Sequence, residues 1–179
     1  MKIKFGLTLF LSFIVIGHLF SQNPTYAIHL SNPIGFLNKV GAKFELKTNR
    51  MGFLLCANNY FDIIVPHYPG VQLGLEWRAY SANDSNKKND TFYYTKLIGG
   101  HQNFRHQSGD GFTNIREVPE GYYYGLGVGV GKQYNFNHYF IELNGGLKGV
   151  LSTVNQEPAF YITGPASFLD LHLNFGYQF

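Results

Sequence analysis

Two histidines, a serine and an aspartate near the two ends of the chain are the residues whose types could do chemistry. His29 and Ser31 lie near the start, and Asp170 and His172 lie near the end. A serine becomes nucleophilic when a histidine accepts its proton and an acid orients that histidine. Ser31, His172 and Asp170 are therefore candidate catalytic residues for acyl transfer, provided that the fold brings both ends together. The competing interpretation is that they form structural hydrogen bonds.

Metal binding is the second chemistry to consider. His101, Arg105, His106 and Asp110 occur in one hydrophilic stretch, but their spacing matches no standard metal motif, so we expect a solvated loop. The single cysteine, Cys56, cannot form an internal disulfide and has no His or Asp motif around it. We expect a small strand residue there, not a nucleophile. We therefore predict no metal and no cofactor.

Alternating glycines from Gly125 to Gly131 superficially suggest a phosphate-binding loop. Such a loop needs glycines between a strand and the start of a helix, whereas these glycines alternate with Leu126, Val128 and Val130 at the period of a strand. We predict close packing inside a narrow barrel instead.

The element that positions Asp170 and His172 is the last stretch of the chain, 166–179. From residue 169 onward, odd positions are apolar or aromatic and even positions are polar or small, which indicates a strand with one apolar face. Its length is that of a strand crossing a bilayer, about 9–11 residues. The apolar set is Leu169, Leu171, Leu173, Phe175, Tyr177 and Phe179.

The start of the chain has the pattern of a secretory signal peptide. Lys2 and Lys4 precede a short apolar run over 5–16, and Ser21 supplies a small residue near the expected cleavage position at Ser21 or Gln22. We predict a signal peptide over 1–22 and one domain over 23–179; the alternative is a retained anchoring helix. Removing both lysines from the 14 basic residues leaves 12 against 11 acidic ones, which does not suggest nucleic-acid binding.

Alternation and turn residues predict eight strands in the mature chain. The first is weak, and the facing of the third is not fixed because 53–56 is a continuous apolar run. The predicted strands are 26–31, 40–47, 51–60, 71–80, 91–104, 122–131, 139–148 and 169–179.

The connections alternate in length. Those after the even-numbered strands are 48–50, 81–90 and about 134–137, and those after the odd-numbered strands include the two longest loops. An even strand number with short turns on one side is the rule for outer-membrane barrels. The weak first strand is needed for this rule, because without it the count would be odd. We predict a closed, antiparallel, up-and-down, eight-stranded transmembrane β-barrel.

The polar faces of these strands carry charges of both signs. An eight-stranded barrel is too narrow for an aqueous pore, so its interior must be filled with side chains. Buried opposite charges must be paired, which predicts a salt-bridged plug; the alternative is a proton or ion path. The predicted lumen network is Lys43, Glu45, Glu76, Arg78, Lys96, Glu142, Lys148 and Asp170, with Lys47 and His172 on the same faces.

Aromatic residues near strand ends would form the belts at the two membrane interfaces. The expected set is Tyr60, Tyr68, Trp77, Tyr93, Tyr94, Tyr122, Tyr124, Tyr139, Phe175, Tyr177 and Phe179.

The last strand resembles the terminal strand of Gram-negative outer-membrane barrels, in which alternating aromatics and a final Phe are recognised by the barrel-assembly machinery. Phe175, Tyr177 and Phe179 match that signal. The segments NPIGFLNKVGAKFEL, PGVQLGLEWRAY and LNFGYQF resemble small outer-membrane β-barrel proteins of the Bacteroidetes type, domains of unknown function. The resemblance implies fold and location, with outer-membrane lipid, the assembly machinery and a surface or periplasmic protein as partners. It implies no catalytic residues.

Three functions are compatible with these observations. The first is a non-enzymatic outer-membrane barrel with a plugged lumen and a structural, adhesion or accessory role through its loops, and this is the one we favour. The second is a lipid A-modifying enzyme using Ser31 and His172, since closure would make the first and last strands neighbours. The third is a soluble periplasmic lipocalin-like barrel with its apolar faces turned inward around a ligand.

Overall fold

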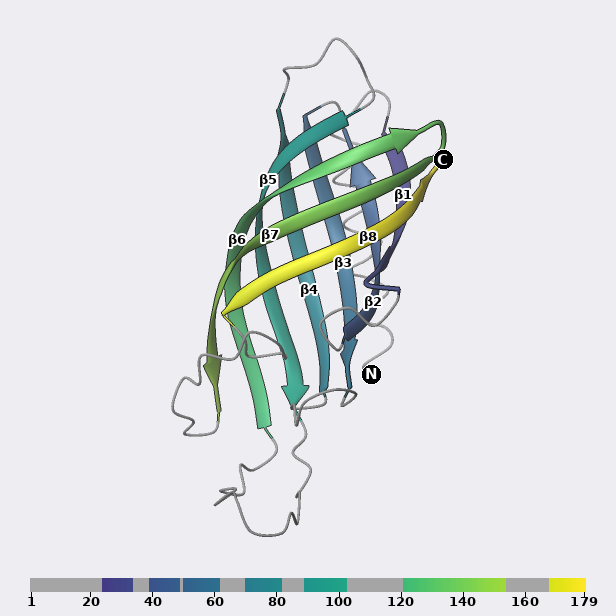
Figure 1. Cartoon of the computed structure of the whole chain (residues 1–179). Coiled ribbons are helices and arrows are strands. Elements are labelled where there is room, and N and C mark those ends of the chain that lie inside the picture. Colours follow the sequence, from purple (N-terminus) through teal and green to yellow (C-terminus); the bar gives the residue numbers. More distant parts are fainter. Residues whose placement is uncertain are drawn as a thin grey trace.

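The structure, a computed structural model, describes residues 24–33, 39–48, 50–61, 70–81, 89–102, 121–153 and 168–179. Each strand pairs antiparallel with the next, and β1 pairs with β8, so the sheet closes into a barrel (Figure 1). The described residues include no helix long and apolar enough to cross a membrane. The predicted signal peptide, 1–22, lies outside them. The strands are β1 (Thr25–Ser31), β2 (Lys39–Lys47), β3 (Met51–Tyr60), β4 (Gly70–Tyr80), β5 (Asn89–Gln102), β6 (Gly121–Phe136), β7 (Tyr139–Ser152) and β8 (Leu169–Gln178).

All eight predicted strands are confirmed, including the weak first one. The end predicted for the sixth strand, at residue 131, is wrong, because β6 continues to Phe136 and pairs there with Tyr139. The chain reverses instead at Asn137 and His138, where Asn137 has a φ of 59°. Asparagine tolerates this left-handed conformation better than most residues. The β6–β7 hairpin is therefore longer and tighter than alternation alone predicts.

The barrel has two distinct ends. The end at which β2 joins β3, β4 joins β5 and β6 joins β7 has the connections 48–50, 81–88 and 137–138, and we call it the short-turn end. The other, which we call the long-loop end, has the connections 32–38, 61–69, 103–120 and 153–168.

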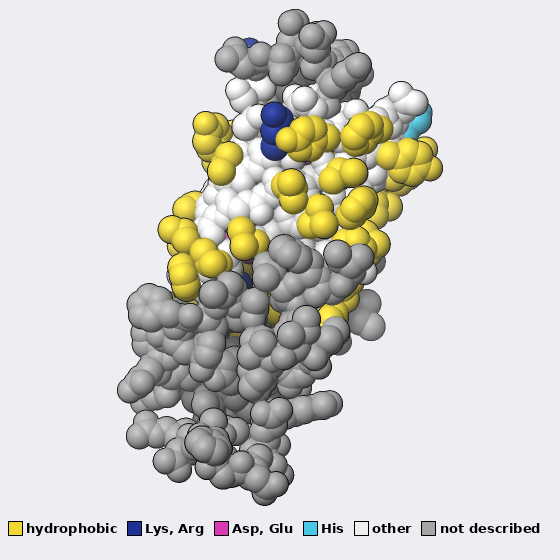
Figure 2. Space-filling model, viewed as in Figure 1, with side chains coloured by type: hydrophobic (Ala, Val, Ile, Leu, Met, Phe, Trp, Pro, Cys, Tyr) yellow, Lys and Arg dark blue, Asp and Glu magenta, His cyan; other side chains and the backbone are white. Residues whose placement is uncertain are grey.

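Apolar side chains cover the outer wall and charged side chains fill the lumen. On β4, for example, Leu73 and Trp77 point outward, whereas Glu76 and Arg78 are buried inside. Figure 2 shows hydrophobic side chains spread over the outer surface of the described strands. A lipocalin-like binder needs the opposite facing, so that alternative is wrong. The unfixed facing of β3 is also settled, with Leu54 and Cys56 inside.

Glycines on the inner wall of β6 and β8 make room for aromatic rings that fill the lumen. A Cβ atom at Gly131 would lie 2.2 Å from Cζ of Phe92, and one at Gly176 would lie 1.9 Å from Cζ of Phe140. A Cβ at Gly129 would lie 2.5 Å from the ring of Tyr94. These glycines therefore serve packing inside the barrel, as predicted for the alternating set.

Two residues of the expected aromatic belts are not on the outer wall. Tyr60 and Tyr94 are buried inside the barrel, because each shares the parity of the inward-facing residues on its strand. Tyr68 lies outside the described residues. The other members are exposed on the outer wall: Trp77, Tyr93, Tyr122, Tyr124, Tyr139, Phe175, Tyr177 and Phe179.

Candidate functional site in the barrel lumen

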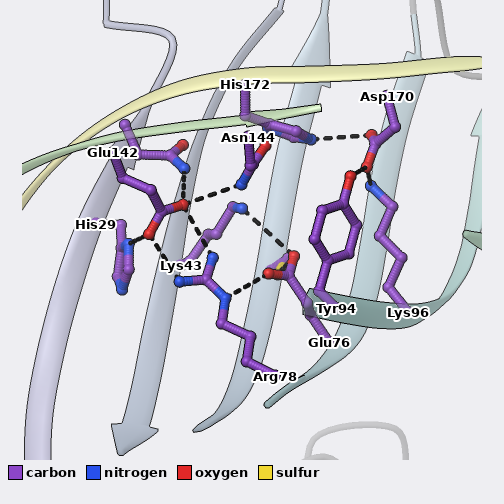
Figure 3. A network of polar contacts seen from close by, with 12 residues as sticks. His29, Lys43, Glu76, Arg78, Tyr94, Lys96, Glu142, Asn144, Asp170 and His172 are labelled. Atoms are coloured by element: carbon purple, nitrogen blue, oxygen red, sulfur yellow. Dashed lines mark hydrogen bonds and ion pairs between the residues drawn. The ribbon is translucent and has the colours of Figure 1, made fainter. Parts of the chain in front are cut away.

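Arg78 of β4 is the centre of the lumen network (Figure 3). Its guanidinium is fully buried and donates from Nε to Oε1 of Glu76 at 2.6 Å. Across the lumen it forms a fork with Glu142 of β7, with Nη1 2.7 Å from Oε2 and Nη2 3.0 Å from Oε1. Nη1 also lies 3.8 Å from Oε2 of Glu45, and Lys43 lies 3.4 Å from Glu76. Such bidentate pairs are geometrically specific.

The carboxylates around Arg78 have further partners. Nε2 of His29 lies 2.9 Å from Oε2 of Glu45, and Nδ1 of the same ring lies 3.5 Å from Oε2 of Glu142. The Tyr80 hydroxyl donates to Oε1 of Glu45. The amide groups of Asn144 and Asn174 donate to Oε1 of Glu142. We call His29, Lys43, Glu45, Glu76, Arg78 and Glu142 the Arg78 cluster.

A second cluster surrounds Asp170 of β8. Its Oδ2 accepts from the Tyr94 hydroxyl at 2.8 Å and pairs with the Lys96 ammonium. Its Oδ1 lies 3.0 Å from Nε2 of His172, and Nζ of Lys39 lies 3.3 Å from the same nitrogen. We call Lys39, Tyr94, Lys96, Asp170 and His172 the Asp170 cluster.

The charges inside the barrel nearly balance. Buried ions in a low-dielectric interior are tolerated when they are paired and hydrogen-bonded, and both clusters meet that condition for their carboxylates. At the short-turn end, Lys47 and Asp90 form a further, partly exposed pair at 2.6 Å. The buried charged residues of the described interior are the cations Lys39, Lys43, Arg78, Lys96 and Lys148 and the anions Glu45, Glu76, Glu142 and Asp170.

The three catalytic candidates are only partly brought together. His172 and Asp170 are in contact, but among the described residues neither the buried Ser31 hydroxyl nor Nδ1 of His172 has a hydrogen-bond partner. In the sheet register Ser31 lies opposite Asn174, not opposite His172. The geometry therefore supplies a histidine oriented by an acid, without the serine–histidine hydrogen bond of an activated nucleophile.

The other candidates are distributed as follows. Cys56 is buried, with Sγ 3.9 Å from Oε2 of Glu76. His101 packs edge-on against Tyr122, whereas 105, 106 and 110 lie outside the described residues. The residues matched to the assembly signal, Phe175, Tyr177 and Phe179, are exposed on the outer wall.

Lys39 and Phe92 are among the lumen residues that the predicted network left out. Lys39 was not assigned because it precedes the clear alternation of β2, yet it shares the parity of Lys43. Phe92, which stacks 4.1 Å from the Arg78 guanidinium, shares the parity of Lys96. Extending the predicted strand 40–47 by one residue would have found Lys39, and applying the parity of Lys96 within the predicted strand 91–104 would have found Phe92.

Removing the Tyr94 hydroxyl tests one bond of the Asp170 cluster. We expect Tyr94→Phe to lower the free energy of unfolding by about 1 kcal/mol, because Asp170 keeps Lys96 and His172 but loses one donor. The measurement is urea unfolding of the protein refolded in detergent. The control is Tyr93→Phe, the outward-facing neighbour, which should leave stability unchanged. Equal effects of both changes would contradict a role for the buried bond.

The sequence matches no protein-family model and no curated protein. Among solved structures, the chain is similar to the crystal structure of the N-terminal β-barrel domain of Pseudomonas aeruginosa OprF. The TM-score is 0.60 at 12% sequence identity, and the match covers 88% of this chain and 100% of the other. The comparison supports the closed eight-stranded barrel fold.

Proposed function

We propose that the chain is a non-enzymatic outer-membrane barrel of the small Bacteroidetes type, with a structural, adhesion or accessory role through its long loops. The observation that carries the proposal is the facing of the barrel, with an apolar outer wall around a charged interior. Water would solvate the charged side chains better than the apolar wall, so an aqueous environment favours the opposite arrangement. A bilayer favours this one.

The lumen supports a structural role more than transport. Arg78 joins β4 to β7 across the interior, and the rings of Phe92 and Phe140 fill space beside it. Side chains thus occupy the lumen in the way expected for eight strands. Partner binding would then depend on surfaces outside the lumen, and the loops at the long-loop end are where barrels of this type vary.

Cell fractionation with a heat-modifiability gel tests the proposal. We expect the protein in the outer-membrane fraction, and we expect its band to shift after boiling, because a closed barrel resists unfolding by SDS at room temperature. Recovery in the soluble periplasmic fraction without a shift would refute it.

Fluorescence of Trp77, the single tryptophan, tests the lipid-facing wall directly. Its side chain is 45% exposed on β4. In vesicles whose acyl chains carry bromine, we expect strong quenching of Trp77, whereas iodide in the water should quench little. The matched control is the double variant Trp77→Phe with Phe92→Trp, in which the single tryptophan faces the lumen. Bromine in the acyl chains should not quench the fluorescence of this variant. Quenching by iodide alone would show that the wall faces water.

A further inference from the structure

Lys132 of β6 is a cation on the apolar outer wall of the barrel. Its side chain is exposed, and it belongs to the alternating outward-facing set of β6, between Val130 and Tyr134. Every other lysine or arginine on the eight described strands occupies an inward-facing position. A charge on the lipid side of a barrel wall is costly at the middle of a bilayer and tolerated near its surfaces. The position of Lys132 along the wall therefore decides which partner it can have.

Lys132 lies near the short-turn end of the barrel. β6 ends four residues later, at Phe136, which pairs with Tyr139 across the hairpin. With a rise of about 3.4 Å per residue and a tilt of about 40°, this separation is roughly 10 Å along the barrel axis. Nζ of Lys132 lies 5.3 Å from the centre of the Tyr134 ring, which is two residues closer to the end. The ammonium group thus extends toward the short-turn end, as lysines near a membrane boundary do.

Uncharged polar side chains lie beside this ammonium group on the wall. In the pairing of β5 with β6, Thr91 lies opposite Lys132, and Asn89 lies opposite Tyr134. Both β5 residues share the parity of Tyr93, which is 64% exposed, so both face outward. Side chains opposite each other on one face have Cβ atoms about 4.5–5.5 Å apart. We call Asn89, Thr91, Lys132 and Tyr134 the Lys132 patch.

The Lys132 patch carries a positive charge and offers hydrogen-bond donors from four side chains. An ammonium group, two hydroxyls and an amide suit the oxygen atoms of a phosphate. Beside the patch, Val130 and Leu143 expose apolar surface. A ligand that fits both features has a phosphate group and a hydrocarbon part, which describes a phospholipid and not a free phosphate ion.

We propose that the Lys132 patch binds the phosphate of an anionic phospholipid in the leaflet at the short-turn end of the barrel. This inference rests on the proposed outer-membrane location. An anionic headgroup is favoured over a zwitterionic one, because a zwitterionic headgroup carries its own cation, which already offsets the charge of its phosphate.

Tryptophan fluorescence next to the patch tests the proposal. The variant Trp77→Phe with Leu143→Trp places the single tryptophan on β7, opposite Lys132. The vesicles contain equal amounts of phosphatidylcholine and phosphatidylglycerol, and bromine is carried by the acyl chains of one lipid or of the other. We expect stronger quenching when phosphatidylglycerol carries the bromine, corresponding to a local preference of about fivefold at low salt. Added salt should weaken this preference.

Further variants serve as controls for the preference. In the same background, Lys132→Met should abolish it, and Lys132→Arg, which keeps the charge, should retain it. The variant Trp77→Phe with Leu73→Trp moves the tryptophan toward the long-loop end, where Leu73 is 65% exposed, and both lipids should quench it equally. A heat-modifiability gel in nonionic detergent, which contains no phosphate, verifies that each variant is folded. If Leu143→Trp does not fold, Val130→Trp replaces it, because this exposed residue is also next to Lys132.

Two results would overturn the proposal: equal quenching by the two brominated lipids at Leu143→Trp, or an unchanged preference in Lys132→Met. Either result would leave the outer-membrane location standing, because quenching by brominated chains itself places the wall in lipid. Absence of quenching by both lipids would refute that location, and this inference with it.

Discussion

Replacing Arg78 by methionine is expected to prevent stable folding of the barrel. The guanidinium is fully buried and contacts the carboxylates of Glu76 and Glu142, with Glu45 nearby. Methionine fills a similar volume but leaves these carboxylates without their shared counter-ion. Breaking a buried ion pair from one side costs about 3–5 kcal/mol. That loss is a large part of the roughly 5–15 kcal/mol by which proteins are stable.

The measurement is the fraction of heat-modifiable protein after refolding in detergent, followed by urea unfolding of whatever folds. Lys132→Met is the control, because it makes the same type of change at an exposed residue. Adding Glu142→Gln to Arg78→Met should recover part of the lost stability, since a neutral amide then replaces one of the carboxylates that has lost its counter-ion. Wild-type stability of Arg78→Met would show that the cluster contributes nothing to folding.

Gly176→Ala is expected to destabilise the barrel, although alanine is a good general replacement for glycine. A Cβ at this position would lie 1.9 Å from Cζ of Phe140. The ring has little room to retreat, because it is buried and packs edge-on against His29 at 4.7 Å. Overpacking of this kind costs about 1–3 kcal/mol.

Gly149→Ala on β7 is the matched control, because a Cβ there meets nothing within 4 Å. We expect urea unfolding to separate the two variants clearly, with Gly149→Ala close to the wild type. Phe140→Leu in the Gly176→Ala background should recover stability by removing the clash. If both alanine variants behaved alike, the glycine would not be needed for ring packing.

Strand positions and facings follow from the sequence wherever charge alternates with apolar side chains. On β4, Glu76 and Arg78 set the inward face without ambiguity. On β3 the alternation is hidden, because Leu54 faces inward between Glu45 and Glu76 of the neighbouring strands. From the sequence alone, an aliphatic residue that packs among buried ion pairs cannot be distinguished from one that faces lipid.

Ion-pair partners could not be predicted from parity. Parity puts Arg78 and Glu142 in the lumen, but it does not say that they meet, because partners depend on register and on contacts across the barrel. The prediction that Tyr60 and Tyr94 belong to the aromatic belts was wrong for a related reason. Tyrosine suits both a membrane interface and a polar lumen, so residue type alone does not decide between them.

The fork between Arg78 and Glu142 has a consequence for the order of assembly. It joins β4 to β7, and the contact of His29 with Glu142 joins β1 to β7, so the two bonds connect strands distant in the chain. A growing sheet that holds only β1 to β4 already has Glu45 and Glu76 near Arg78, but it lacks Glu142, so neither bond to β7 can form. These two bonds therefore stabilise the protein only once the sheet closes into a barrel, after most of the loop-closure entropy has been lost. Closure should consequently be a cooperative, late step, and partly formed sheets should be short-lived.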